Sequence, residues 1–311
     1  MIKILTFGEL LWDLFPDKKE IGGAPLNFSA YLAKMGENIS LISAVGKDGL
    51  GKDALKLASE YGICCDFIKE NDYPTGIVNI TTKNDTPKYD IVTGAAYDHI
   101  DLSGDILERL KEFDVFYFGT LAQRSTVSRN TLRTILSART FKEIFCDINI
   151  RQRYYDAQTL ELCLKYATVL KFSREEIGVF EELNLTQAKA APYSGAANDC
   201  LDFCREIRRK YSNGKDRDYN EIKVIIITLD KDGSILYDAA RDKMIKSQKP
   251  EGEVVSAVGA GDSFFACFAH HYLKGSPLKE CIGKAAKLSS YVITQFGAVC
   301  DYPGDLMDEI L

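Results

Sequence analysis

The sequence predicts an α/β protein with a mostly parallel sheet that is covered by helices on both faces. Short runs rich in β-branched and aromatic residues alternate with amphipathic stretches of period 3.6. Such alternation is typical of strand–helix–strand units, in which parallel strands are buried on both faces. The 311 residues are 46% hydrophobic and 27% charged, which is enough for a sizeable core and excludes disordered and disulfide-stapled classes.

Seven strands are predicted from these apolar runs, and eight helices lie between or after them. The strand candidates are residues 2–7, 39–45, 115–118, 144–148, 169–172, 224–228 and 234–237. The helix candidates are residues 25–35, 51–61, 103–112, 126–139, 159–167, 199–211, 261–274 and 278–295. Residues 211–220 have the composition of a solvated loop.

One region interrupts the alternation. Residues 64–98 contain no helical pattern, only alternating runs at 76–82 and 89–93 that polar turns separate. We expect a single domain over 1–311, with a small inserted β-sheet built from about 12–22 and 64–98. The position of this sheet in the chain suits a lid.

Composition also limits the partners and the compartment. The net charge is −6 and the pI about 5.3, so nothing favours nucleic acid or an anionic membrane surface as a partner. The N-terminus lacks a signal-peptide pattern, and no apolar run is long enough to span a bilayer. Nine cysteines, three histidines and no C-x-x-C pair indicate reduced core thiols rather than disulfides or a metal site. We therefore expect a cytoplasmic protein.

The most informative motif is Val258-Gly-Ala-Gly-Asp262, directly before an amphipathic helix. A helix N-terminus attracts anions, and Gly259 and Gly261 let the backbone approach a phosphate closely. An aspartate beside such a cradle suits a base that accepts a hydroxyl proton while a phosphoryl group is transferred. The alternative is that Asp262 caps the helix and the glycines form a tight turn.

A second glycine cluster, Gly22-Gly-Ala-Pro-Leu-Asn27, opens the helix at 25–35. Asn27 lies off the apolar stripe of that helix, and Asp13 follows the first strand, where α/β proteins bind ligands. Turn and cap hydrogen bonds are the alternative roles for both. Residues 46–52 match Gly-x4-Gly-Lys, but Asp53 stands where a P-loop needs Ser or Thr. We interpret that segment as an ordinary strand-to-helix turn.

The two glycine motifs together resemble the N-terminal and C-terminal signatures of the ribokinase-like (PfkB) carbohydrate kinases. The chain between them also fits. Residues 147–151 resemble the D-x-N-x-R strand end of that family, 171–176 its N-x-x-E segment, and 228–233 its T-x-G-x-x-G turn. The resemblance covers essentially the whole chain and implies the three-layer ribokinase-like α/β fold.

The resemblance also implies roles for particular residues. Asp262 would be the base, and the N–H groups of Gly259, Ala260 and Gly261 would stabilise the transferred phosphoryl group. ATP would lie near Lys171, Thr228, Gly233 and Gly261, and Glu176 would organise Mg²⁺ through water. The implied sugar-binding residues are Asp13, Gly22, Gly23, Asn27, Tyr97 and Arg151, of which Arg151 would also lie near the phosphates. Tyr97 is alternatively a core residue.

Three departures from the family pattern weaken particular assignments. Ser256 replaces the aspartate that gives an activating K⁺ a side-chain ligand, so Ser256 and Gly297 form only a candidate K⁺ site. Ser173 replaces the asparagine of N-x-x-E, and Asp230 replaces a glycine of the nucleotide turn.

Residues 8–13, 94–98 and 118–125 look most like the fructokinase branch. Residues 89–96 lack the arginine with which kinases of 2-keto-3-deoxygluconate hold a carboxylate, so a neutral sugar is favoured. Arg124 and Arg151 leave an acid substrate open. A nucleoside kinase on the same scaffold, or a sugar sensor that binds without turnover, would also fit these residues. A homodimer through the lid is expected by analogy.

Overall fold

The computed structural model describes residues 2–83, 86–102, 104–186, 197–212, 220–250 and 252–311. Its centre is a nine-stranded sheet in the order β13-β12-β11-β10-β9-β8-β1-β4-β5, parallel from β11 to β5, with β12 and β13 antiparallel. The strands are β1 (Lys3–Phe7), β4 (Asn38–Gly46), β5 (Ile68–Asn71), β8 (Val115–Gly119), β9 (Glu143–Asp147), β10 (Val169–Ser173), β11 (Val224–Thr228), β12 (Ser234–Asp238) and β13 (Lys243–Lys246).

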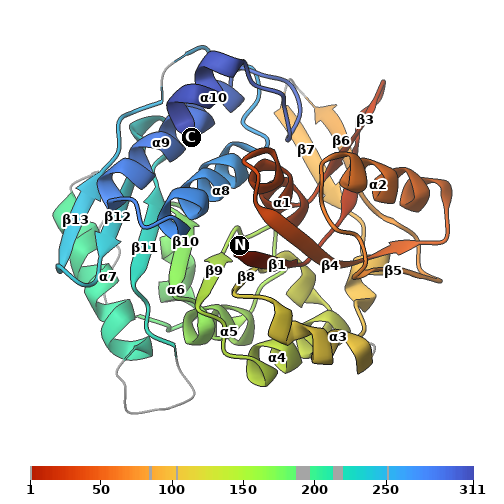
Figure 1. The fold of residues 1–311 in the computed structure, drawn as a ribbon, viewed down its shortest axis with the longest axis horizontal. Helices are drawn as coiled ribbons and strands as arrows, with labels where there is room; N and C mark the ends of the chain where they lie inside the picture. The colour runs from red at the N-terminus through yellow and green to blue at the C-terminus, as the bar shows by residue number, and fades with distance from the viewer. Residues whose placement is uncertain (1, 84–85, 103, 187–196, 213–219, 251) are drawn as a thin grey trace.

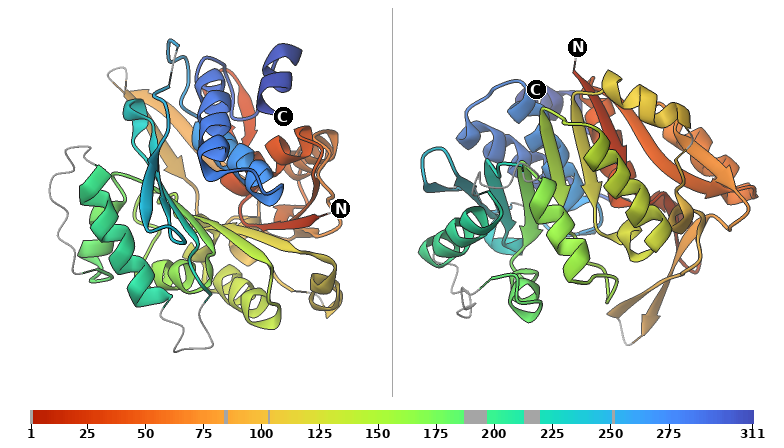
Figure 2. Two further views of the ribbon diagram at one scale, coloured as in Figure 1. Left: turned by 60° about the vertical axis from the view of Figure 1, so that its left-hand side comes forward. Right: turned by 90° about the horizontal axis from the view of Figure 1, so that it is seen from below.

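Helices cover both faces of this sheet (Figures 1 and 2). One face packs against α1 (Ala24–Lys34), α2 (Gly49–Glu60), α8 (Ala260–Leu273), α9 (Leu278–Val292) and α10 (Gly304–Ile310). The other packs against α3 (Gly104–Arg109), α4 (Thr126–Ala138), α5 (Ala157–Tyr166), α6 (Ile177–Glu182) and α7 (Ala197–Tyr211). Short 3₁₀ helices are η1 (Ala96–His99), η2 (Leu110–Glu112), η3 (Leu121–Arg124) and η4 (Asp230–Asp232).

The strands are apolar on both sides because successive side chains enter different cores. In β8, Phe116 and Phe118 point toward α3–α7, whereas Val115 and Tyr117 point toward α1 and α8. All four are almost completely buried. The prediction of a mostly parallel, doubly covered sheet is confirmed.

A second sheet lies at one side of the first (Figure 1) and has the order β3-β2-β6-β7. Its strands are β2 (Leu11–Leu14), β3 (Lys19–Gly22), β6 (Gly76–Lys83) and β7 (Thr86–Ile91). The Trp12 indole donates a 3.0 Å hydrogen bond to the Leu50 carbonyl and so ties β2 to α2. A Cβ atom at Gly76 would lie 2.5 Å from the Tyr97 ring, so β6 passes over that ring only because it has glycine there.

The structure corrects the expectation for residues 64–98 in two places. Ile68–Asn71 pairs in parallel with β4 and extends the large sheet, because α2 returns the chain to that edge. Residues 96–99 form the 3₁₀ helix η1, in which the Asp98 carboxylate accepts hydrogen bonds from the Gly94 and Ala95 amides. This local capping has no periodic signal in the sequence. Within the expected loop at 211–220, residues 213–219 lie outside the described part.

The strand β13 and the helices α6 and α10 were not predicted. Each has four to seven residues, too few for hydrophobic periodicity to be distinguished from a turn. The interpretation of residues 46–52 as a strand-to-helix turn is confirmed, because the Asp48 carboxylate caps α2 by accepting the Gly51 N–H at 2.7 Å.

None of the nine cysteines, all of which lie in the described ranges, forms a disulfide, and six of them are buried. Among the described residues there is no group of three metal-ligating side chains. In the same part of the chain, every helix is too short or too polar to cross a membrane.

We predict that Phe28→Ala destabilises the protein strongly. The Phe28 ring is buried, stacks 4.0 Å from the Tyr117 ring and contacts Phe265 of α8 at 5.7 Å. Its removal leaves a cavity between α1 and the sheet, so we expect a loss of about 3–5 kcal/mol in the free energy of unfolding. Urea denaturation measures it, with the exposed Val127→Ala of α4 as control. Equal midpoints for both variants would contradict this packing role.

Candidate active site

The N-terminus of α8 is shaped by Gly259, which has φ 78° in the left-handed region. A Cβ atom there would lie 2.1 Å from the Ala298 carbonyl oxygen, so only glycine fits. This turn brings the N–H groups of the first turn of α8 to the carboxyl end of the large sheet. Asp262 lies in that turn and is buried.

Asp262 is held by Asn27 of α1, whose Nδ2 donates a hydrogen bond of 2.7 Å to Oδ2 of the carboxylate. This bond joins the two glycine motifs across 235 positions of sequence. The Asn27 Oδ1 atom is buried and has no hydrogen-bond partner among the described residues. A buried acceptor without a partner is costly. Its position beside Asp262 therefore makes it a candidate acceptor for a ligand hydroxyl.

The charges around Asp262 act in opposite directions. Burial raises the pKa of its carboxyl above the ordinary value, and the negative charge of Asp147 raises it further. The hydrogen bond from Asn27 and the positive charges of Lys171 and Arg151 oppose this rise. The balance is a carboxyl that accepts a proton more readily than an exposed aspartate does.

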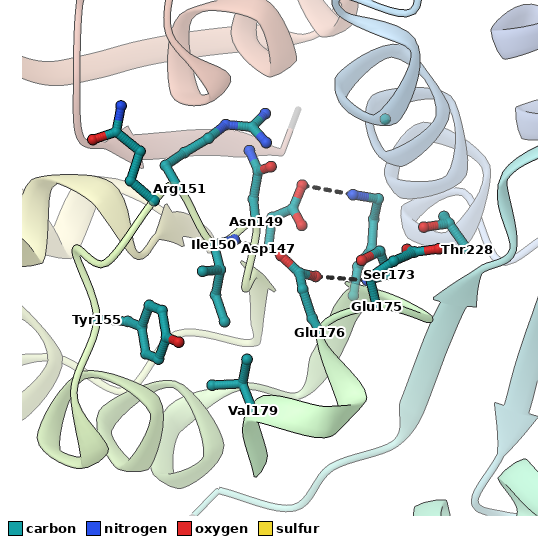
Figure 3. Close-up of a pocket in the computed structure, with 13 residues that line it drawn as sticks. Asp147, Asn149, Ile150, Arg151, Tyr155, Ser173, Glu175, Glu176, Val179 and Thr228 are labelled. Carbon is teal, nitrogen blue, oxygen red and sulfur yellow. Dashed lines mark hydrogen bonds and ion pairs between the residues drawn. The ribbon is translucent and has the colours of Figure 1, made fainter. Parts of the chain in front are cut away.

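A cavity of about 440 Å³ opens beside the start of α8. Figure 3 shows its lining, in which most of the polar groups lie at the ends of β9 and β10 and in the segments that follow these strands. The Lys171 ammonium pairs with the Asp147 carboxylate at 2.8 Å, and both side chains are almost fully buried. The lining residues are Asp147, Asn149, Ile150, Arg151, Gln152, Tyr155, Lys171, Ser173, Glu175, Glu176, Val179, Thr228 and Gly261.

Glu176 closes one wall of this cavity. Its two carboxylate oxygens accept hydrogen bonds from the backbone amides of Ile150 and Ser173, the latter at 2.6 Å. Burial raises the pKa of Glu176, and the nearby charge of Asp147 adds to the rise. Glu176 thus holds the loop after β9 against the end of β10.

Arg151 projects from a loop with unusual backbone geometry. Asn149 and Gln152, on either side of it, have φ 39° and 51°. The arginine is exposed, yet its charge lowers the pKa values of Glu9, Asp13 and Asp262. It is therefore within electrostatic reach of three carboxyl groups, and it connects the cavity with the glycine turn that precedes α1.

The residues expected to bind sugar lie on the α1 side of Asp262. Asp13 of β2 contacts the turn, because a Cβ atom at Gly22 would lie 3.0 Å from its Oδ2 atom. Burial and the charge of Glu20 raise the pKa of Asp13 to about 6. Gly23, with φ 113°, fits against the Glu9 carbonyl, where a Cβ atom would approach to 2.3 Å.

Four further predicted site residues also lie outside the cavity lining. Tyr97 is completely buried, with Gly76 against its ring and the Arg124 guanidinium 4.8 Å from its centre. Its ring faces are covered, and only its hydroxyl, which has no partner among the described residues, is left as a contact. Gly233 turns between β11 and β12, and the Ser256 hydroxyl accepts the Val258 N–H. Gly297, with φ 88°, lies close to Glu20.

Two carboxyl groups and one ion pair of the site have no role in the sequence predictions, although Asp147 begins the D-x-N-x-R segment and Arg124 by itself leaves an acid substrate open. Glu9 lies two residues after β1, and Asp147 is the last residue of β9. Their position at the carboxyl ends of strands is the signal that could have found them. The third is the Asp98–Arg124 ion pair, with N–O distances of 2.7 and 2.9 Å. It forms between η1 and η3, which no pattern predicts.

The geometry agrees with one protein family. The family model of the pfkB family carbohydrate kinases matches residues 6–303. The chain belongs to this family. It is an ATP-dependent sugar phosphotransferase.

This pfkB kinase is similar in sequence and in structure to individual members of the family. It is 25% identical to an ATP-dependent 6-phosphofructokinase of Thermoanaerobacterium thermosaccharolyticum, over 96% of this chain and 90% of that protein. The 2-dehydro-3-deoxygluconokinase structure of Thermotoga maritima superposes with a TM-score of 0.82, at 20% identity, over 100% and 99% of the two chains. The ATP-bound fructokinase of Xylella fastidiosa gives 0.75, at 17% identity, over 95% and 93%. These likenesses confirm the expected ribokinase-like fold.

We predict that Gly259→Ala nearly abolishes kinase activity, because its methyl group would strike the Ala298 carbonyl and displace the first turn of α8. Gly283→Ala in α9 is the matched control, since its methyl group meets open space and favours the helix by about 0.5–1 kcal/mol. Steady-state kinetics and thermal unfolding of both variants test this. Near-normal turnover by Gly259→Ala would show that the turn tolerates a side chain.

A second prediction concerns pH and stability. Burial raises the pKa of Glu9 to about 7 from an ordinary 4.5. A carboxyl with a raised pKa favours folding at low pH, and that contribution is lost as the pH rises from 4.5 to about 7. Glu9→Gln removes the ionisation, so its unfolding free energy should exceed that of the wild type by about 2–3 kcal/mol at pH 8 and by little at pH 4.5.

Urea denaturation at the two pH values measures this difference. Glu182→Gln, at an exposed position of α6, is the control and should show no pH-dependent gain. A Glu9→Gln variant that is no more stable than the wild type at pH 8 would contradict a buried, ionising Glu9.

Proposed function

We propose that this kinase transfers the γ-phosphoryl group of ATP to a hydroxyl of a small neutral sugar, with fructose as the best candidate. The single observation that carries the proposal is the placement of Asp262. Its buried carboxylate lies in the first turn of α8, beside the N–H groups of Gly259, Ala260 and Gly261. A proton acceptor and an anion-stabilising helix terminus are thereby combined at one point.

The two sides of Asp262 suggest how the reaction proceeds. A sugar bound by Asp13, Gly22, Gly23 and Asn27 presents a hydroxyl to the Asp262 carboxylate, which takes its proton as the oxygen attacks phosphorus. The free Oδ1 of Asn27 accepts a second sugar hydroxyl. The backbone N–H groups of residues 259–261 stabilise the charge on the phosphoryl oxygens, which is the largest demand of this transition state.

The cavity of about 440 Å³ is the proposed place of the ATP phosphates, with Lys171, Thr228 and Gly261 along them and Gly233 beside the nucleotide. Mg²⁺ prefers oxygen ligands and keeps several waters. Glu176 would hold it through water, and the buried Asp147 Oδ1, which has no partner among the described residues, fits the same role. Magnesium supplies charge neutralisation on the phosphates. A K⁺ ion at Ser256 and Gly297 and a homodimer through the small sheet, as a lid, stay predictions.

A neutral sugar is favoured by the pairing of Arg124. Its guanidinium donates two hydrogen bonds to Asp98 and one to the Val92 carbonyl, so its charge is compensated. Arg151 is the exposed cation that keeps a second candidate, the keto acid 2-keto-3-deoxygluconate, in consideration. The named relatives are kinases of fructose 6-phosphate, 2-dehydro-3-deoxygluconate and fructose. This supports a sugar or sugar derivative as the substrate, and experiment must decide which one.

We predict that Asp262→Asn lowers kcat by about 10²–10⁴-fold, because asparagine cannot accept the hydroxyl proton. Sugar affinity should change little, since the side chain keeps its shape. ADP release with MgATP measures turnover, and calorimetry measures binding. Asp202→Asn, at a largely exposed position of α7, is the control. A variant with normal kcat would exclude Asp262 as the base.

The sugar itself is tested by a panel of fructose, ribose, 2-keto-3-deoxygluconate, tagatose, fructose 6-phosphate and adenosine, with and without K⁺. We expect the highest kcat/KM with fructose. A preference for an anionic substrate that Arg151→Gln removes would select the second candidate. Binding of a sugar without ADP release from any substrate would contradict the proposed function.

A further inference from the structure

Glu9 is a buried glutamate whose backbone is firmly held. It follows Gly8 at the carboxyl end of β1, and its residue is only 5% exposed. The Gly8 amide donates to the Ile42 carbonyl at 3.2 Å, and the Ser43 hydroxyl donates to the Gly8 carbonyl at 2.7 Å. The backbone directly before Glu9 is therefore fixed to the central part of the large sheet.

The side chain of Glu9 extends from the end of β1 to the start of α1. Its Oε1 atom accepts the hydrogen bond of the Ala24 amide, the first N–H of that helix, at 3.2 Å. The Glu9 carbonyl oxygen lies against Gly23, and the preceding residue Gly8 packs against Pro25. Gly23, at the N-cap position, has no side chain with which to cap the helix. A carboxyl group at this point satisfies an otherwise open donor and interacts favourably with the helix dipole.

Glu9 also belongs electrostatically to the site. The groups within reach of it are Asp262 on α8, Arg151 after β9, Tyr97 on η1 and Tyr117 on β8. Burial of a carboxyl among them costs stability, and a glutamine or an apolar residue would avoid that cost. A glutamate at this position does, however, cap α1 from the end of β1. It thereby links β1 both to the Gly22-Gly23 turn and to the first turn of α1.

We propose that Glu9 is a positioning residue for the sugar half of the site. By holding the Ala24 amide, it keeps the Gly22-Gly23 turn in place. It also fixes the position of α1 along its axis, and therefore the position of Asn27 relative to Asp262. This inference rests on the proposed sugar kinase activity, because that activity assigns the turn and Asn27 to the sugar. The nucleotide half of the site, built on β9, β10 and β11, does not depend on Glu9.

The test compares Glu9→Ala, Glu9→Gln and Glu37→Ala. Glutamine keeps an oxygen for the Ala24 amide, whereas alanine does not. Glu37 lies just beyond the other end of α1, with its carboxylate 2.8 Å from Nδ1 of His270 of α8, so it is a matched glutamate at the opposite end of the same helix. The readouts are KM for sugar, KM for ATP, kcat, and amide hydrogen exchange of residues 24–27, of which Pro25 has no amide hydrogen.

We expect Glu9→Ala to raise the sugar KM and to lower kcat, each by about tenfold, with the ATP KM within about twofold of wild type. Exchange at residues 24–27 should accelerate in this variant. Glu9→Gln should restore both KM and exchange, and Glu37→Ala should lower the melting temperature without changing either KM.

Unchanged exchange at residues 24–27 in Glu9→Ala would overturn the inference whatever the activity. An equal rise of both KM values, or a loss that glutamine does not rescue, would also overturn it. These results are distinct from failure of the proposed function, in which the wild type itself turns over no sugar while the exchange experiment still reports on Glu9.

Discussion

The hydrogen bond from Asn27 to Asp262 is the interaction on which the candidate site depends. It connects the first turn of α1 with the first turn of α8, and both turns are set by glycines that no other residue could replace. The aromatic contact between Phe28 and Phe265 lies directly behind it and fixes the separation of the two helices. In the proposed function the sugar binds at the α1 turn and the phosphoryl group at the α8 turn, so a small shift between the two helices would separate the base from its substrate.

This arrangement has a cost in buried charge. Glu9, Asp147 and Asp262 are buried carboxyl groups and Glu176 is partly buried, and desolvation raises the pKa of Glu9, Glu176 and Asp262. Lys171 pairs with Asp147, and Arg151 reaches several of the others only from the exposed side. The excess of negative charge opposes folding but suits a site that binds a cation-bound nucleotide and accepts a proton.

The sequence was most informative where local pattern and chemistry coincide. The apolar runs predicted seven strands of the large sheet within a few residues, because a strand that is covered on both faces must be apolar on both sides. These strands are β1, β4, β8, β9, β10, β11 and β12. The glycine motifs predicted where α1 and α8 begin. Prediction failed for β5, η1 and the Asp98–Arg124 pair. The strand β5 forms by pairing with β4, and Asp98 of η1 is paired with Arg124 of η3, so each depends on a segment that is distant in the chain. For Tyr97 the structure shows the buried ring of the core alternative, and a contact of its hydroxyl with sugar stays a prediction.

The sequence by itself determined the fold class, the family resemblance and the residue types needed for phosphoryl transfer, because these follow from periodicity and from short motifs whose chemistry is local. Only the tertiary structure decided how those residues act on one another. The raised pKa of Asp262, the open acceptor of Asn27, the compensation of Arg124 by Asp98 and the capping of α1 by Glu9 all arise between segments far apart in the chain. Burial and through-space charge depend on distance in space, which a linear pattern does not contain.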